Sequence, residues 1–92
     1  MTVRIYQVHM EGGEEHEHIA EVAWVNVADP NEKGTSSRSG MVQWLEEAPS
    51  HRAIVSDGMS SVEVGVVNAT PKYLRTHADG KWTNNLLALP RY

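Results

Sequence analysis

Short runs of β-branched and aromatic residues alternate with glycine- or proline-bearing turns along most of the chain. Val3–Met10 alternates between two faces, and Ile19–Val27 is rich in valine and carries Trp24. The acidic segment Glu11–Glu15 between them holds two adjacent glycines, which tolerate the positive φ of a tight reversal. This pattern predicts a β-hairpin at the start of the chain.

One helix is predicted in the middle of the chain. The apolar residues of its buried stripe follow the i, i+3, i+4, i+7 spacing of a helix: Met41, Trp44, Leu45 and Ala48. Ser39 is expected to be the N-cap, and Pro49 ends the helix because proline has no N–H to continue it. The preceding segment Ala28–Ser37 is predicted to be a loop, since it contains turn residues and few apolar ones.

Three further strands are predicted after the helix, at His51–Ser56, Ser61–Asn68 and, as a short strand, Lys72–Thr76. Gly65 lies inside the second of these strands and indicates a bulge or a close approach of another group to the backbone. Asp79-Gly80 is a strong turn signal after the third.

The tail from Trp82 to Tyr92 carries three leucines before Pro90 and is expected to form irregular or 3₁₀ structure that packs on the core. The elements follow the order β-β-α-β-β-(β). We therefore predict an α+β fold, with a small, mostly antiparallel sheet of four to five strands and one helix packed on one face. Residues 1–92 are expected to form a single domain.

Composition narrows the classes of protein that this chain can belong to. The chain has 92 residues, of which 40% are hydrophobic and 22% charged, and it has no cysteine. The lack of cysteine excludes disulfides, thiolate metal sites and cysteine catalysis. No apolar run approaches the roughly 18 residues of a membrane helix, and the N-terminal residues do not resemble a signal peptide. The expected location is the cytoplasm, with no membrane partner.

Charge is distributed unevenly along the chain. Seven acids and no Lys or Arg lie between Glu11 and Glu32, whereas the segment from Lys72 to Tyr92 has four bases against one acid. The asymmetry indicates either two functional faces or the ordinary solvated sides of a sheet. The net charge of −4 argues against strong non-specific binding to nucleic acid.

The C-terminal third has a distinctive set of short motifs: Lys72-Tyr73-Leu74-Arg75-Thr76, Asp79-Gly80, Asn85-Leu86-Leu87 and Leu89-Pro90. With the opening strand and the central helix, these motifs resemble the bacterial and phage family called domain of unknown function 3892. The resemblance covers nearly the whole chain and implies one small α+β domain, but it supplies no activity. The acidic Glu11–His18 turn and the Trp82-bearing insertion depart from the family pattern.

The same C-terminal strip supplies the main binding candidates: Lys72, Tyr73, Arg75, Trp82 and Asn85. Tyr, Trp and Arg are the residue types that dominate protein-binding hot spots. Arg and Lys also hold phosphates, aromatic rings stack on bases and asparagines read base edges, so a nucleic-acid-binding accessory domain is the alternative. The simpler alternative is that Trp82 packs within the domain and the charged residues only keep the domain soluble.

Histidines offer a second candidate chemistry. His16 and His18 would share one face of a strand, and His9 could approach them across the hairpin. Three imidazoles would suit a transition metal, but no residues that would orient them are identifiable. The alternative is an ordinary solvated hairpin turn.

Catalytic motifs are absent from the sequence. His51, Asp57 and several serines occur, but a triad depends on spatial geometry, and no Gly-x-Ser-x-Gly, phosphate-loop or zincin pattern is present. We therefore predict a protein that is not an enzyme and needs no cofactor. The expected function is an interaction module whose exposed sheet face and C-terminal strip bind another macromolecule, more often protein. A homodimer through an exposed valine-rich edge strand is a further alternative.

Overall fold

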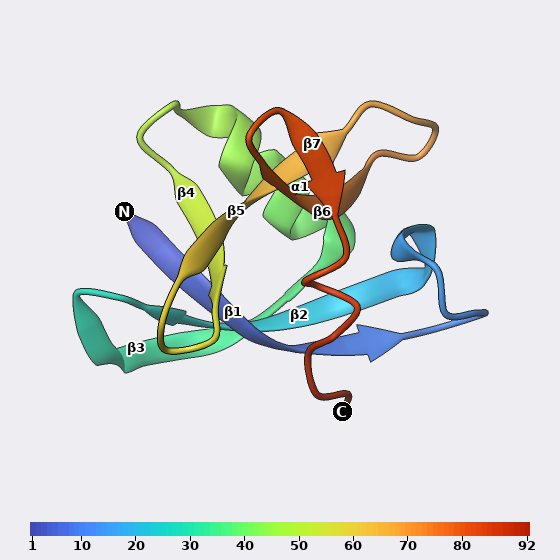
Figure 1. The fold of residues 1–92 in the computed structure, drawn as a ribbon. Helices are drawn as coiled ribbons and strands as arrows, with labels where there is room; N and C mark the ends of the chain where they lie inside the picture. Colours follow the sequence, from blue (N-terminus) through green and yellow to red (C-terminus); the bar gives the residue numbers. More distant parts are fainter.

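The computed structural model describes residues 1–92 and is dominated by one curled β-sheet (Figure 1). The elements in chain order are β1 (Thr2–Met10), the 3₁₀ helix η1 (His16–His18), β2 (Ile19–Asn26), β3 (Asp29–Ser37), α1 (Arg38–Glu47), β4 (Arg52–Ser56), β5 (Ser61–Val67), β6 (Tyr73–Ala78) and β7 (Lys81–Thr83). Neither helix is long and apolar enough to cross a membrane.

The sheet has seven strands in the order β3-β2-β1-β4-β5-β6-β7. Every neighbouring pair is antiparallel except β1 and β4, which are parallel over Thr2–Arg4 and Arg52–Ile54. Parallel neighbours need a crossover connection, and α1 provides it between β3 and β4. The helix therefore joins two antiparallel halves, β1–β3 and β4–β7, into one sheet.

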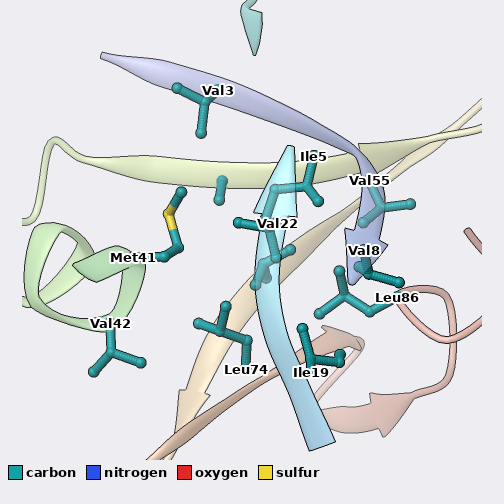
Figure 2. Close-up of a cluster of buried hydrophobic side chains, with 12 residues drawn as sticks. Val3, Ile5, Val8, Ile19, Val22, Met41, Val42, Val55, Leu74 and Leu86 are labelled. Atoms are coloured by element: carbon teal, nitrogen blue, oxygen red, sulfur yellow. The ribbon is translucent and has the colours of Figure 1, made fainter. Parts of the chain in front are cut away.

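The core fills the space between the concave face of the sheet and α1, as the inward-pointing side chains of Figure 2 show. Strand alternation supplies most of it. Its members are Val3, Ile5, Val8, Ile19, Val22, Met41, Val42, Ala53, Val55, Val64, Leu74 and Leu86. Trp44 and Leu45 of the predicted helical stripe are partly buried against this cluster.

The C-terminal tail closes the core from the side that α1 does not cover. Leu86 is fully buried, and i→i+3 bonds such as Leu87 N–H to Asn84 O (3.1 Å) give the segment the expected 3₁₀-like turns. Val8 N–H donates to Pro90 O at 3.0 Å, and Tyr92 N–H donates to Val8 O at 3.2 Å. The tail thus occupies the edge of β1 beyond the residues that pair with β4, and the predicted packing of the tail is confirmed.

The prediction of an α+β fold with four to five strands is wrong. The protein is mostly β, with seven strands and one α-helix. The larger error lies at Ala28–Ser37, where the predicted loop is β3, joined to β2 by the two-residue turn Val27-Ala28. β3 lies at the exposed edge of the sheet, so its side chains do not need to be apolar. Its backbone is hydrogen-bonded to β2, and this pairing makes it a strand.

The second strand that the sequence pattern missed is β7. Asp79 (φ 53°) and Gly80 (φ 77°) form the predicted turn, and positive φ at both residues is typical of a type I′ hairpin. The returning strand has only three residues, too few for an alternating pattern. The helix also begins earlier than predicted, because Ser37 is the N-cap in place of Ser39 and its Oγ accepts from Gly40 N–H at 3.1 Å.

Leu74→Ala should lower the free energy of unfolding by about 2–5 kcal/mol, because Leu74 is fully buried and its removal leaves a cavity. Urea unfolding at neutral pH measures the change. Val27→Ala, at a residue that is 52% exposed, is the control and should change stability by less than about 0.5 kcal/mol. A loss below about 1 kcal/mol for Leu74→Ala would show that the core does not depend on this contact.

Candidate interaction surface

The convex face of β5–β7 gathers three of the five predicted binding residues. Tyr73 and Arg75 lie on the face of β6 opposite to the buried Leu74 and Thr76. Trp82 of β7 is directly across from His77 and therefore lies on the same face. We call Tyr73, Arg75, His77 and Trp82 the aromatic face.

Gly65 leaves space for a pair of rings at the centre of this face. The His77 and Trp82 rings meet edge to face, with centroids 5.6 Å apart at an interplanar angle of 81°. A Cβ at Gly65 would lie 2.9 Å from His77 Cδ2 and 3.4 Å from Trp82 Cζ3. A residue without a side chain leaves room for the His77 ring in this position, which confirms the expected close approach to the backbone at Gly65.

Arg75 is engaged within the protein. Its Nε donates to Thr83 O at 3.1 Å, and a terminal nitrogen donates to Asn84 Oδ1 at 3.0 Å. These bonds attach the residues after β7 to β6. The guanidinium therefore holds the start of the tail in place, and much of its donor capacity is already used.

The other two predicted binding residues do not join this face. Lys72 Nζ pairs with Glu46 Oε2 of α1 at 2.8 Å, while Asn85 N–H donates to Thr76 Oγ1 at 3.1 Å. Asn85 instead lines a cavity of about 250 Å³ with Asp57 and Ser60 of the β4–β5 turn. Lys72 and Asn85 were predicted to join the other three residues because they are close to them in sequence, but the folded chain separates them from the aromatic face.

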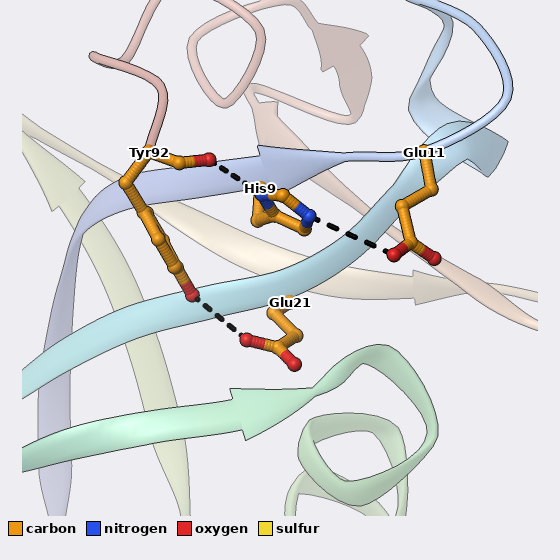
Figure 3. A network of polar contacts seen from close by, with 4 residues as sticks. All are labelled: His9, Glu11, Glu21 and Tyr92. Atoms are coloured by element: carbon orange, nitrogen blue, oxygen red, sulfur yellow. Dashed lines mark hydrogen bonds and ion pairs between the residues drawn. The ribbon is translucent and has the colours of Figure 1, made fainter.

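The three candidate metal ligands have separate surroundings. His9 Nδ1 contacts the backbone oxygen of Tyr92, and its Nε2 lies 3.7 Å from Glu11 Oε1, as Figure 3 shows. His18 Nδ1 accepts from Glu15 N–H at 3.3 Å, and His16 is buried. The structure contains no group of three or more His, Asp or Glu residues placed to hold a metal ion.

Tyr92 extends the polar network around His9 on the convex face of β1 and β2 (Figure 3). Its hydroxyl donates to Glu21 Oε1 at 3.4 Å, and its ring centroid lies 5.5 Å from that of His9. Burial, followed by the negative charge of Glu21, raises the pKa of the Tyr92 hydroxyl. These contacts hold the end of the tail against β1.

The residues weighed for catalysis do not form a triad. His51 and Asp57 flank opposite ends of β4, five residues long, so they lie roughly 17–20 Å apart. His51 stacks on Trp44 at 4.3 Å with an interplanar angle of 6°. Asp57 accepts from Met59 and Ser60 N–H, both at 2.9 Å, and these bonds lower the pKa of its carboxyl. Both side chains therefore have structural roles.

Sequence reasoning missed His77 as a member of the aromatic face. Its spacing contained the signal, because Tyr73, Arg75 and His77 follow i, i+2, i+4 and must share one face of a strand. The predicted strand ended at Thr76, one residue too early to include it. The length of β6 is set by its pairing with β7, which the pattern did not show.

His16 is expected to make stability depend on pH. Burial, followed by the positive charge of Arg75, lowers its pKa below the usual value, against the opposing charges of Glu15 and Glu17. Only 5% of the residue is exposed, and its Nε2 has no hydrogen-bond partner. The folded protein therefore binds the proton less readily than the unfolded chain, so stability is full above about pH 6.5 and falls as the pH drops below it.

Urea unfolding at pH 7.5 and pH 5 checks this expectation. The loss of stability on acidification should be smaller in His16→Leu than in the unaltered protein, whereas His18→Gln, at the neighbouring partly exposed histidine, should retain it. An equal loss in His16→Leu would exclude His16 as the group responsible.

Gly65→Ala should turn the His77 ring away from residue 65 and move Trp82 with it, because the new methyl group would lie within 3.0 Å of the imidazole. We expect the NMR signal of the Trp82 indole N–H to shift, with a loss of about 1 kcal/mol in stability. Gly34→Ala is the matched control, since its methyl would contact Trp24 at 3.4 Å and leave Trp82 undisturbed. An unmoved Trp82 signal in Gly65→Ala would show that Gly65 does not set the position of the Trp82 ring.

Comparison with known proteins identifies the family and nothing beyond it. A model of the family described as "Protein of unknown function (DUF3892)" matches residues 4–90, so it spans all seven strands except the first two residues of β1. No curated protein and no solved structure matches the chain. With the match covering nearly its whole length, the chain belongs to the DUF3892 family.

Proposed function

We propose that this protein is a non-enzymatic interaction module that binds a protein partner through the aromatic face. The observation that carries the proposal is the placement of Trp82, which is 47% exposed on an edge strand and held there by His77 and Gly65. Exposed Trp and Tyr residues provide large contact area and are enriched in protein-binding hot spots. The proposal includes a cytoplasmic location, which the absence of cysteine fits.

Preorganisation favours binding at this face. The T-shaped contact with His77 restricts the Trp82 ring, and the bonds of Arg75 to Thr83 and Asn84 hold the chain that follows. A partner would therefore immobilise few additional rotamers on docking, and each one already fixed saves about 0.5–1.5 kcal/mol of binding free energy.

The engagement of the basic residues favours protein over nucleic acid. Lys72 pairs with Glu46, and Arg75 and Arg91 donate to backbone oxygens of Thr83 and Leu87. Lys81 alone among the four bases of the C-terminal strip has no partner within the protein. Nucleic-acid binding depends on several free cations that displace counterions, and the net charge of −4 opposes it.

The strand order bears on self-association. The valine-rich strand β5 is paired on both sides, by β4 and β6, so it offers no free edge. The two edges are β3 and β7. β3 carries Pro30 and Lys33, residues that discourage edge-to-edge pairing, and β7 has only three residues. These features favour a different protein over a second copy as the partner.

Site-resolved photo-crosslinking tests the proposal. Benzoylphenylalanine replaces Trp82 or Tyr73 on the aromatic face, or Lys33 on β3 as the control, in cells of the organism that encodes the protein. We expect one protein adduct common to positions 82 and 73 and absent at 33. Adducts of equal yield at position 33, or adducts removed by nuclease, would overturn the proposal.

Binding of the purified partner to variants completes the test. Trp82→Ala should raise the dissociation constant about tenfold or more, as expected of a hot-spot tryptophan. Val27→Ala removes an exposed apolar side chain from the other end of the sheet and should leave the dissociation constant unchanged. Equal effects of the two substitutions would exclude the aromatic face as the binding site.

A further inference from the structure

A second site lies at the other end of the sheet, where α1 crosses β1, β2 and β3. It is a cavity of about 250 Å³ lined mainly by apolar side chains. These are Met1, Val3, Trp24, Met41 and Trp44. In the sheet, β4 and β5 separate the strands of this cavity from β6 and β7 of the aromatic face.

Trp24 forms one wall of the cavity and is held by a hydrogen bond. Its Nε1 donates to Ser36 Oγ of β3 at 3.0 Å. Its ring passes over Gly34, where a Cβ would lie 3.4 Å from Cζ2. An added Cβ at Gly34 would make only an ordinary contact with the ring, so the hydrogen bond is what fixes the indole against β3, and it satisfies the one donor of the indole.

Trp44 of α1 forms a second wall and is held by His51. His51 stacks on it at 4.3 Å, nearly parallel, and His51 Nδ1 contacts Trp44 O at 2.7 Å. The connection between α1 and β4 therefore holds this indole in place. Rigid aromatic walls lose little entropy when a flat molecule binds between or against them.

The chemistry of the lining selects an uncharged ligand. None of the seven lining residues carries an ionisable side chain, and the α-ammonium of Met1 is exposed and donates to Ser50 O at 3.4 Å, so an ion buried among the apolar side chains would find no counter-charge there. Apart from the indole N–H groups, Ser36 has the one polar side chain of the lining. Ser36 Oγ already accepts from Trp24, and its own hydrogen has no acceptor within the protein, which leaves one donor for a ligand.

We propose that this cavity binds a small, uncharged, planar aromatic molecule that carries one hydrogen-bond acceptor. An apolar cavity of about 150 Å³ is large enough for benzene, so about 250 Å³ suits one or two fused rings. The two indoles offer ring faces and edges for stacking, and the Met1 and Met41 thioethers provide soft contacts with an aromatic ring. Ser36 would donate to the acceptor and orient the ligand.

Methionine methyl NMR provides the test, because the four methionines divide evenly between the cavity and the rest of the protein. Met1 and Met41 line the cavity, whereas Met10 and Met59 do not. Protein labelled at the methionine methyl groups is titrated with quinoline, which is neutral above pH 7 and has a ring nitrogen as its acceptor. We expect saturable shifts of Met1 and Met41, with Met10 and Met59 unmoved.

Charged and larger probes test the selectivity. Naphthalene-1-sulfonate and naphthylmethylammonium have two rings and a full charge, and each should bind about tenfold more weakly or worse than quinoline. Pyrene, with four rings, should not enter. Shifts that are equal at Met59, absent with quinoline, or as strong with the charged probes would each overturn the proposal.

Paired tryptophan variants locate the site. Trp44→Leu keeps an apolar side chain but removes one aromatic wall, and it should weaken quinoline binding by about fivefold or more, as expected from losing an aromatic contact. Trp82→Leu, on the aromatic face, is the matched control and should leave binding unchanged. Ser36→Ala keeps the cavity and should reduce the preference for quinoline over naphthalene. Equal binding by Trp44→Leu and the unaltered protein would contradict the site.

Discussion

One constraint shapes this protein: a seven-stranded sheet has a single apolar face, and the chain provides only one helix to cover it. α1 has ten residues and is about 15 Å long, whereas seven strands laid flat would extend about 29 Å across. The sheet curls, and the C-terminal tail covers the remainder by inserting Leu86 into the core. The bonds between Val8 and the residues around Arg91 then hold the tail on β1.

The polar residues of the C-terminal third are largely used to maintain this closure. Arg75 and the hydroxyl of Thr76 bond to residues 83–85, where the tail begins, and His9 and Glu21 contact Tyr92, where it ends. A basic strip that resembles a ligand-binding surface in the sequence is therefore, in part, the set of contacts that closes the core. What remains free for a partner is mainly aromatic.

At both proposed sites an aromatic ring lies over a glycine of a neighbouring strand, but the glycine is required at one of them alone. A Cβ at Gly65 would lie 2.9 Å from the His77 ring on the convex face, whereas a Cβ at Gly34 would make an ordinary contact of 3.4 Å with the Trp24 ring on the concave face. The lack of a side chain at Gly65 therefore leaves room for the His77 ring, whereas Trp24 is fixed by its hydrogen bond to Ser36. The surroundings differ, because Trp82 of the convex pair is 47% exposed, whereas Trp24 lines a cavity together with residues of α1.

Local periodicity determined most of the strands, the helix and the turns from sequence alone. Alternation puts Val3 and Ile5 on one face and separates Leu74 from Tyr73 and Arg75, because successive side chains of a strand point to opposite faces. Asp79-Gly80 identified its hairpin turn, because it readily adopts the positive φ that the turn requires. The family resemblance also followed from the C-terminal motifs, and the match over residues 4–90 confirmed it.

Only the tertiary structure decided the strand order, the identity of β3 and the surroundings of the functional side chains. β3 is polar and becomes a strand because β2 offers a backbone edge, a partner that no local pattern encodes. The crossover through α1 sets β1 beside β4, and the curl of the sheet buries His16 and directs Arg75 to Thr83 and Asn84. Such contacts join residues far apart in the chain, so they depend on how the elements pack and not on which elements form.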